Sequence, residues 1–134
     1  MSRLEPVEHR PVARAAPPGR VLVTGAPGWL GSRLVRRLRA QQRDVRCLVF
    51  PGHWERAAVL RRPELRDTDV VFGDIRDRES VRRAATGART VFHLAGIRHP
   101  SRIGEFDSVN VRGTAIVAEE AARAGVERFV NVSS

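Results

Sequence analysis

The sequence contains no tyrosine and no lysine, and it has only one cysteine in 134 residues. A single cysteine cannot form a disulfide within the chain, so Cys47, in the apolar segment DVRCLVF, is interpreted as a buried thiol of a reducing, cytoplasmic protein. No apolar run approaches the roughly 18 residues that suggest a membrane-spanning helix, so no such helix is expected. No metal site is expected either.

Basic charge comes entirely from 24 arginines, which outnumber the 15 acids and give a formal net charge of +9. Such a charge can indicate a nucleic acid or an anionic membrane as partner. The arginines extend from Arg3 to Arg128, and many fall on the polar positions of expected helices, as at Arg36 and Arg82. This spread favours a solvated surface, so neither a nucleic acid nor a membrane is expected as a partner. The phosphates of a cofactor are the expected anions.

The order of apolar runs and helical patterns predicts the domain organisation. Residues 1–19 mix proline, arginine, alanine and glutamate without periodicity, which predicts a flexible tail. Residues 20–134 alternate short apolar runs with helical patterns, which predicts one domain of five strands and four helices. The expected strands are VLVTG, DVRCLVF, DVVFGD, RTVFHLAG and ERFVNVSS, and the expected helices are WLGSRLVRRLRA, HWERAAVLRR, RESVRRAA and EFDSVNVRGTAIVAEEAARAG.

The expected strands are nearly continuous in apolar residues, which is typical of parallel strands covered on both faces by helices. We therefore predict an α/β fold with a doubly wound, Rossmann-like parallel sheet and with ligands at the carboxyl ends of the strands. In the first helix, Leu30, Leu34 and Leu38 recur every fourth residue beside Val35. This stripe should pack on the sheet.

The segment TGAPGWLG, Thr24 to Gly31, directly follows the first expected strand and opens the first expected helix. Gly25 permits a tight turn, Gly28 lets the backbone approach a pyrophosphate, and Gly31 allows close packing of helix and strand. The free N–H groups at the helix start then form an anion site that requires no charged side chain. A glycine-rich turn without a ligand is the alternative.

The GxxGxxG spacing of TGAPGWLG resembles that of the extended short-chain dehydrogenases/reductases, the NAD-dependent epimerase/dehydratase family. Four more segments resemble motifs of this family in the same order, namely VVFGDIRD, VFHLAGIRHP, VNVRGT and FVNVSS. The resemblance covers residues 20–134 and implies NAD or NADP as cofactor. The cofactor-binding residues that it implies are Thr24, Gly25, Gly28, Trp29, Leu30, Gly31, Asp74, Ile75, Leu94, Ala95, Gly96 and Asn110.

The resemblance also implies individual roles. It places Asp74 with Ile75 at the adenine and Ala95 with Gly96 beside the nicotinamide half of the cofactor. It aligns Ser134 with the family's catalytic serine, which helps hold the reacting oxygen while a tyrosine transfers the proton. The alternatives are a turn carboxylate at Asp74 and a strand-end serine at Ser134.

Four other polar residues of these segments have more than one interpretation. Asn110 matches an asparagine near the cofactor in relatives, or it is a polar residue on an exposed turn. Arg98 is either close to the cofactor or substrate, or in solvent. His93, alone in an apolar strand, is interpreted as a core residue without a proton-transfer role. Asp77 precedes RESVRRAA and is interpreted as a helix N-cap.

The chain departs from the family at the catalytic Tyr-x-x-x-Lys motif, because it contains neither residue type. Proton transfer, typically worth about 10²–10⁴-fold, is then missing, and the chain is expected to be inactive by itself. A sixth strand and a substrate lobe are also expected to be missing, as in a truncated gene, a split frame or an incomplete sequence. We therefore expect an open edge at the fifth strand and uncovered apolar residues at Val109, Ile116 and Val117. Homo-oligomers through this edge and helix are expected as a consequence.

A second departure concerns the choice of cofactor. An acid for the ribose hydroxyls is expected about 20 residues beyond the glycine motif. Val49 and Phe50 stand there instead, so the usual device selects neither NAD nor NADP. His53 and Arg56 are candidates for contacts to a phosphate.

Together these observations predict the NAD(P)-binding part of an NAD-dependent epimerase/dehydratase, with carbinol oxidoreductase chemistry that in relatives often acts on sugar nucleotides. A small-molecule substrate is expected only in a full-length relative. The alternatives are a non-catalytic dinucleotide-binding regulatory module and a gene remnant.

Overall fold

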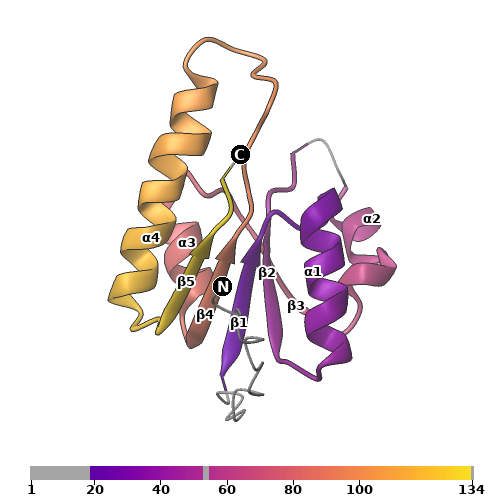
Figure 1. Ribbon diagram of the computed structural model, residues 1–134. Coiled ribbons are helices and arrows are strands. Elements are labelled where there is room, and N and C mark those ends of the chain that lie inside the picture. Colours follow the sequence, from indigo (N-terminus) through magenta and orange to yellow (C-terminus); the bar gives the residue numbers. More distant parts are fainter. Residues whose placement is uncertain (1–18, 53–54, 134) are drawn as a thin grey trace, which may run out of the picture.

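The computed structural model describes residues 19–52 and 55–133, so all of the expected tail except Gly19 lies outside the described residues. The described residues form one five-stranded parallel sheet in the order β3-β2-β1-β4-β5 (Figure 1). The elements are β1 (Arg20–Thr24), α1 (Trp29–Ala40), β2 (Val45–Val49), α2 (Arg56–Leu60), the short 3₁₀ helix η1 (Pro63–Leu65), β3 (Asp69–Phe72), α3 (Arg78–Ala85), β4 (Ala88–His93), the π-helical segment η2 (Asp107–Gly113), α4 (Thr114–Arg123) and β5 (Arg128–Asn131).

The strand order confirms the predicted doubly wound, Rossmann-like sheet. The chain moves outward from β1 through β2 to β3, then returns to the other side of β1 for β4 and β5. Val23 of β1 pairs with Cys47 of β2 and with Phe92 of β4, so β1 lies at the centre of the sheet. The order of the strands reverses between β1 and β4, and the carboxyl ends of these two strands are where a ligand is expected in such a sheet.

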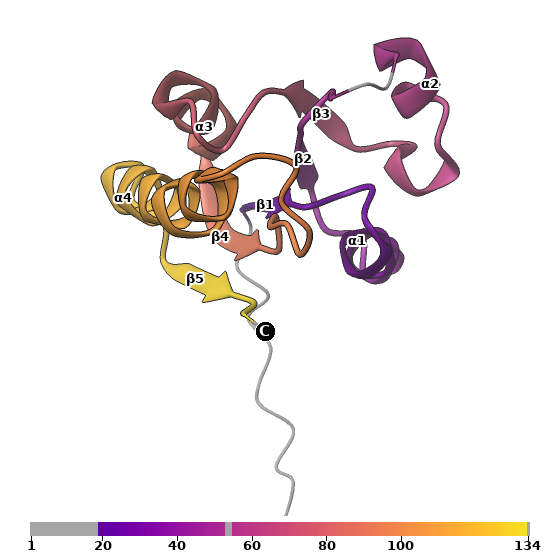
Figure 2. The ribbon, with the colours of Figure 1, turned by 90° about the horizontal axis from the view of Figure 1, so that it is seen from above.

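Two hydrophobic cores form, one on each face of the sheet. Helices α1 and α2 lie on one side and helices α3 and α4 on the other (Figure 2). Val35 and Leu38 of α1 are buried in the first core, and Val81 of α3 and Val117 of α4 are buried in the second. Fully burying one such side chain is worth about 1.5–3 kcal/mol, so these residues fix the helices to the sheet.

The structure corrects the expected burial of Leu30 and Val117 and confirms that of Cys47. Leu30 was expected to join the apolar stripe of α1, but it is 44% exposed and lines a cleft instead of the core. Val117 was expected to be uncovered, but it is 1% exposed because this side of α4 packs on the sheet. Val109 and Ile116 are partly buried against the same core. Cys47 is fully buried, as predicted, and burial raises the pKa of its thiol to about 12.

Helix α3 begins and is anchored as its sequence indicates. The carboxylate of Asp77 accepts hydrogen bonds from the backbone N–H groups of Glu79 and Ser80, which confirms the predicted N-cap. Arg78 of α3 donates to the carboxylate of Glu120 on α4 at 2.8 Å, and the side chain of Glu120 is 1% exposed. The pKa of Glu120 is held below its usual value, and the hydrogen bond from Arg78 is the largest cause. Strand β5 is an edge strand among the described residues.

No helix in the described part of the chain has the length and apolar character to cross a membrane.

Candidate functional site

A cleft of about 1010 Å³ opens at the carboxyl ends of the strands, at the position where the strand order reverses. Its walls come from the turn after β1, the start of α1, the ends of β2 to β5 and the helical segment η2. Eleven residues predicted from the sequence line it together: Gly25, Gly28, Trp29, Leu30, Gly31, Asp74, Ile75, Leu94, Ala95, Gly96 and Asn110. Thr24 lies directly beneath them, and Ser134 lies outside the described residues.

The three glycines of the first motif pack around one carbonyl group. Gly25 has φ +92°, and a Cβ there would lie 2.8 Å from the backbone nitrogen of Ala95. A Cβ on Gly28 would lie 2.6 Å from the carbonyl oxygen of Gly25, and a Cβ on Gly31 would collide with the same oxygen. The turn therefore requires glycine at each position because of its own packing, before any ligand is considered. This adds to the reason expected for Gly28, which was clearance for a pyrophosphate.

Helix α1 begins at this turn with its N–H groups uncapped. Within the described residues, no side chain caps the helix start, and its first turn contains no acid. Gly28, Trp29 and Leu30 line the cleft, so the start of α1 lies at its wall. The positive end of the helix dipole and the unpaired N–H groups of the first turn favour an anion at this position.

A buried hydrogen-bond network supports the wall formed by the end of β4. The hydroxyl of Thr24 lies 2.7 Å from Nδ1 of His93 and accepts the N–H of Ala95 at 3.2 Å. It also accepts the N–H of Leu94 at 3.2 Å, which the carbonyl oxygen of Thr24 shares. The other ring nitrogen of His93, Nε2, lies 3.0 Å from the hydroxyl of Thr114 in α4. The network therefore joins β1, β4 and α4 directly below the cleft.

The network determines which ring nitrogen of His93 carries the proton. A hydroxyl has one proton and two lone pairs, and two N–H donors already occupy the lone pairs of Thr24. Thr24 must then donate to Nδ1 of His93, so the imidazole is neutral with its proton on Nε2, which donates to Thr114. Burial lowers the pKa of His93 to about 4, in agreement with a neutral ring. Both ring nitrogens are used, which confirms the interpretation of His93 as a core residue.

Asn110 fixes the loop that follows β4. Its side-chain amide accepts from the N–H of Ile97 and donates to the carbonyl of Ile97, both at 2.9 Å. A Cβ on Gly96 would lie 3.2 Å from Oδ1 of Asn110, so this glycine permits the close contact. Asn110 is half-buried in the π-helical segment η2, which excludes the exposed-turn interpretation. Wide turns of this kind are often found at functional sites.

The far end of the cleft contains a carboxylate held by an arginine. Asp74 accepts a hydrogen bond from the backbone N–H of Arg76 at 2.9 Å and a side-chain bond from its Nη2 at 2.7 Å. Partial burial works to raise the pKa of Asp74, but the hydrogen bonds and charge of Arg76 together lower it below its usual value. Asp74 therefore serves its own turn and also lines the cleft. Ile75 is buried, and its Cδ1 would lie 2.7 Å from a Cβ on Gly113.

The end of β2 carries no carboxylate into the cleft. Phe50 is 58% exposed and lines the cleft, and the guanidinium of Arg76 lies 5.8 Å from the centre of its ring. Arg56, expected as a phosphate contact, instead lies over the ring of Phe72 at 5.1 Å and does not line the cleft. His53 lies outside the described residues.

Some lining residues were not expected from the sequence. Arg98 does line the cleft, as one of its two interpretations required. Arg76, Thr114, Asn131 and Ser133 also line it. Arg76 belongs to the segment VVFGDIRD and Thr114 to VNVRGT, so both motifs contained these positions. The described residues include no group of three or more histidine, cysteine, aspartate or glutamate side chains that could hold a metal ion.

Comparison with known proteins places this site in a family. The profile of the NAD dependent epimerase/dehydratase family matches residues 21–134. The chain belongs to the NAD-dependent epimerase/dehydratase family. It is 34% identical over 134 residues to the protein y4nL of Sinorhizobium fredii, which covers 95% of this chain and 37% of y4nL. It is 40% identical over 116 residues to the sterol demethylase protein B of Methylococcus capsulatus, which covers 84% of this chain and 34% of that protein.

Solved structures with a similar fold contain bound NAD. A short-chain dehydrogenase/reductase superfamily protein of Agrobacterium tumefaciens with bound NAD matches at a TM-score of 0.70 and 32% identity, over 86% of this chain and 32% of that one. The enzyme WbmG of Bordetella bronchiseptica in complex with NAD matches at a TM-score of 0.72 and 29% identity, over 90% of this chain and 38% of WbmG. The chain therefore spans about a third of the length of these relatives.

Proposed function

We propose that this chain is the dinucleotide-binding part of an NAD(P)-dependent epimerase/dehydratase, whose complete relatives act at a carbinol carbon. The observation that carries the proposal is the uncapped start of α1 at the wall of the cleft, directly after the tightly packed glycine turn. In this arrangement the N–H groups of the first turn would bind the pyrophosphate of the dinucleotide.

The other parts of the cleft suit the two ends of a dinucleotide. Asp74 and Ile75 would receive the adenine, because they lie at the end of β3 and line the cleft there. Ala95 and Gly96 would lie along the nicotinamide half, where small residues allow close approach to the backbone. In a complete relative, the nicotinamide held here would supply the hydride chemistry at the carbinol carbon. The contribution of Thr24 and Asn110 would be to hold the β4 wall in position through their bonds to Ala95 and Ile97.

The described residues offer no substitute for the missing proton-transfer groups. The chain has no tyrosine and no lysine. His93 is not a replacement acid, because burial lowers its pKa to about 4 and both ring nitrogens are engaged by threonine hydroxyls. We therefore propose that the chain binds the dinucleotide without catalysing turnover by itself. Sugar nucleotides remain one candidate substrate class, since WbmG has also been solved with NAD and UDP.

A non-catalytic module remains the second candidate function. It is favoured by the same observation, namely an intact dinucleotide cleft in a chain without the Tyr-x-x-x-Lys residues. Both candidates bind the dinucleotide. The enzyme part needs further residues to complete the reaction, whereas the module needs none because it does not catalyse one.

Substitution of Leu30 tests the binding step, because this exposed side chain lies in the first turn of α1 and lines the cleft. In Leu30→Asp the new carboxylate should stabilise the helix by about 0.3–1 kcal/mol through its dipole. The same charge should repel the pyrophosphate and weaken NADH binding about tenfold, since two charges about 8–12 Å apart at an effective dielectric of 20 interact with roughly 1–2 kcal/mol.

Leu30→Asn is the matched control, because it has nearly the same shape without the charge. Binding is measured by nicotinamide fluorescence and stability by thermal melting. A Leu30→Asp variant that binds NADH as tightly as Leu30→Asn would contradict a pyrophosphate site at the start of α1. Nicotinamide absorbance of the wild-type chain should stay constant with alcohols or nucleotide sugars, and sustained oxidation or reduction would contradict the inactive binding part.

A further inference from the structure

The arginines are spread along the sequence but are not spread evenly over the fold. Residues 29–68, from α1 to the start of β3, contain ten arginines and four acids. Residues 69–133 contain ten arginines and nine acids. A general preference for arginine over lysine decides which basic residue is used. It does not explain why basic residues outnumber acidic ones in the first segment. Most arginines of the first segment lie on α1, on α2 or beside η1. Arg46 on β2 is an exception, because it is paired with Asp69 and donates to backbone carbonyls at the end of α3.

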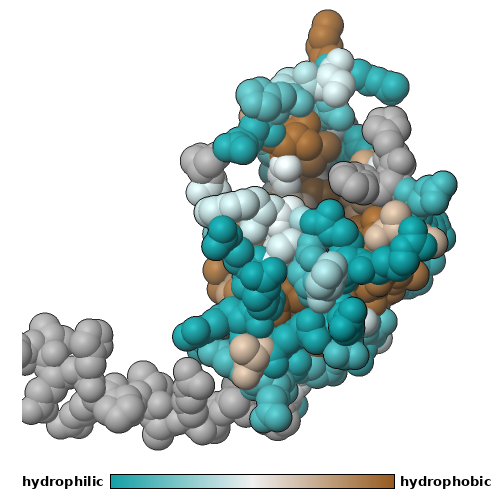
Figure 3. Space-filling model, turned by 90° about the vertical axis from the view of Figure 1, so that its right-hand side faces the viewer, coloured by the Kyte–Doolittle hydropathy of each residue, from teal (hydrophilic) through white to brown (hydrophobic). Residues whose placement is uncertain are grey.

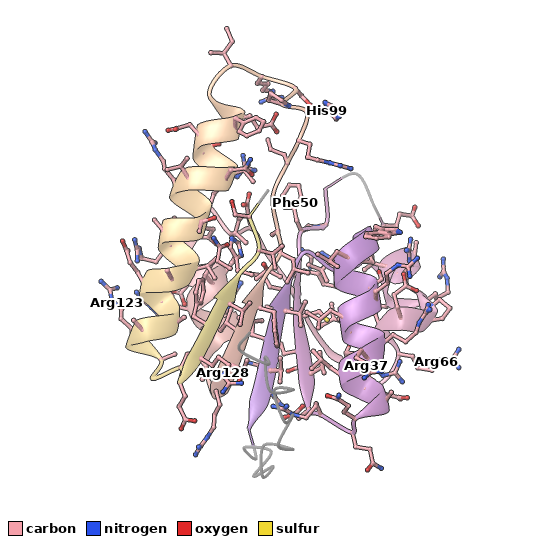
Figure 4. The ribbon with its side chains drawn as sticks, in the orientation of Figure 1. Arg37, Phe50, Arg66, His99, Arg123 and Arg128 are labelled. Carbon is pink, nitrogen blue, oxygen red and sulfur yellow. The ribbon has the colours of Figure 1, made fainter. Side chains whose placement is uncertain are left out.

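Six of these arginines form one exposed surface, which we name the basic face: Arg33, Arg36, Arg37, Arg56, Arg61 and Arg66. The first three lie on α1, and the others lie on α2 or beside η1. Arg39 joins the two parts, because it bonds to Asp67 at 3.0 Å and to the carbonyl of Pro63 at 3.4 Å. In Figure 4 Arg37 and Arg66 point outward from neighbouring elements on the same side of the molecule.

The basic face carries charges without acidic partners. None of its six guanidinium groups has an ion pair within the described residues. On the side of α3 and α4, by contrast, Arg78, Arg82 and Arg123 are all paired with Glu120, and Arg83 is the exposed arginine of α3 without an ion pair among the described residues. Uncompensated arginines at the surface attract phosphate groups, for which the guanidinium fork is suited.

Apolar side chains accompany these arginines. Trp29 at the start of α1 is 75% exposed with Arg33 stacked over its ring at 4.6 Å, and Leu60 at the end of α2 is 53% exposed. Figure 3 looks onto this side and shows hydrophilic residues over most of its lower part, with hydrophobic surface mainly in the hollow higher up. Arginines beside an exposed tryptophan and leucine are typical of surfaces that lie on a bilayer, where the indole sits at headgroup level.

We infer that the basic face docks this chain on an anionic phospholipid bilayer. The attraction comes from the complementary charges of the arginines and the anionic lipid headgroups. The wide surface made by two elements fits a flat bilayer better than the groove of a duplex, into which a single element is inserted. The expectation from the sequence, that no membrane is a partner, rested on the spread of arginines from Arg3 to Arg128 and on their positions on the polar faces of expected helices. This inference is independent of the proposed dinucleotide binding, because docking is measured without any cofactor.

The test is sedimentation of the whole chain with phosphatidylcholine vesicles and with vesicles of equal parts phosphatidylcholine and phosphatidylglycerol. The variant Arg37→Glu/Arg66→Glu changes the basic face, and Arg83→Glu/Arg128→Glu makes the same change of net charge on exposed arginines elsewhere. We expect binding to the anionic vesicles only, weakened roughly twentyfold or more by the first pair and less than about threefold by the second. Arg36→Glu/Arg61→Glu should repeat the first result, and circular dichroism checks that each variant is folded.

Three results would overturn the inference. Equal binding to neutral and anionic vesicles would mean that the arginines are not responsible. Equal losses in the two double variants would mean that only the net charge of the chain matters. Binding to a short DNA duplex but not to the vesicles, with the same sensitivity to Arg37 and Arg66, would identify a nucleic-acid surface instead.

Discussion

Thr24 at the end of β1 and His93 at the end of β4 are joined by a buried hydrogen bond of 2.7 Å. The bond runs from the threonine hydroxyl to Nδ1, because the lone pairs of that hydroxyl are already taken by Leu94 and Ala95. One threonine therefore sets both the state of the histidine and the position of the backbone that lines the cleft.

This relationship predicts a specific loss of stability in acid. Burial lowers the folded pKa of His93 from 6.5 to about 4, so the unfolded state binds more protons between these values. Stability is then fully present above about pH 6.5 and is lost as the pH falls towards 4, by roughly 3 kcal/mol in total. Urea unfolding across this range should show a steeper decline for wild type than for His93→Gln. Parallel declines would contradict a buried neutral His93.

The glycine turn should tolerate no side chain at Gly25. Gly25→Ala places a methyl group 2.8 Å from the β4 backbone at φ +92°, so we expect a loss of at least about 3 kcal/mol. Gly87→Ala is the matched control, because φ is +76° there but nothing lies within 4 Å of the position that the new methyl group would take. This control should lose only about 1–2 kcal/mol, and equal losses in chemical unfolding would show that the contact with β4 is unimportant.

Removal of the Asn110 side chain should release the loop after β4 and weaken NADH binding. Asn110→Ala loses both hydrogen bonds to Ile97, so the Ile97 amide should exchange with solvent at least about tenfold faster. Affinity for NADH should fall about five- to tenfold because binding must then order the loop. Val111→Ala, at a 60% exposed neighbour, should change neither quantity. An unchanged Ile97 amide in Asn110→Ala would refute this role.

The missing acid at the end of β2 predicts weak discrimination between the two dinucleotides. With Phe50 at this position, NADH and NADPH should bind within about tenfold of each other. Phe50→Asp should weaken NADPH about tenfold by repulsion of its 2′-phosphate, while NADH changes little. Phe50→Asn supplies the uncharged comparison, and Phe50 is 58% exposed, so neither change should disturb folding. Equal effects of aspartate on both dinucleotides would place the ribose elsewhere.

Most of the fold followed from local sequence patterns because parallel strands and amphipathic helices have distinct periods. Periodicity misplaced Leu30, since it does not reveal which turn of a helix lines a cleft instead of the core. Val117 was misplaced for another reason: the helix was expected to lose a neighbour, but Val117 faces the sheet and is buried there. The partners of His93 were also beyond prediction, because Thr24, His93 and Thr114 are distant in the sequence. The packing of Gly28 against Gly25 likewise depends on the three-dimensional path of the turn.

The glycines of the cleft were predicted from their place between the first strand and the first helix, and the other cleft residues from the resemblance of their segments to the family's motifs. The role of Arg76 in the cleft was not predicted. In the sequence it looks like any solvent-exposed arginine, and only the structure shows its hydrogen bonds to the carboxylate of Asp74. The basic face was missed because spacing along the chain conceals which helices share a face of the sheet.

The most direct test of the account is a titration of the isotopically labelled chain with NADH, followed by the backbone amide signals in NMR spectra. We predict the largest shifts at Gly28 to Gly31 and at Ala95 and Gly96, because the start of α1 and the end of β4 form the walls of the proposed site. Signals of α3 should stay in place. A folded chain whose Gly28 to Gly31 signals do not move at saturating NADH would contradict dinucleotide binding in this cleft.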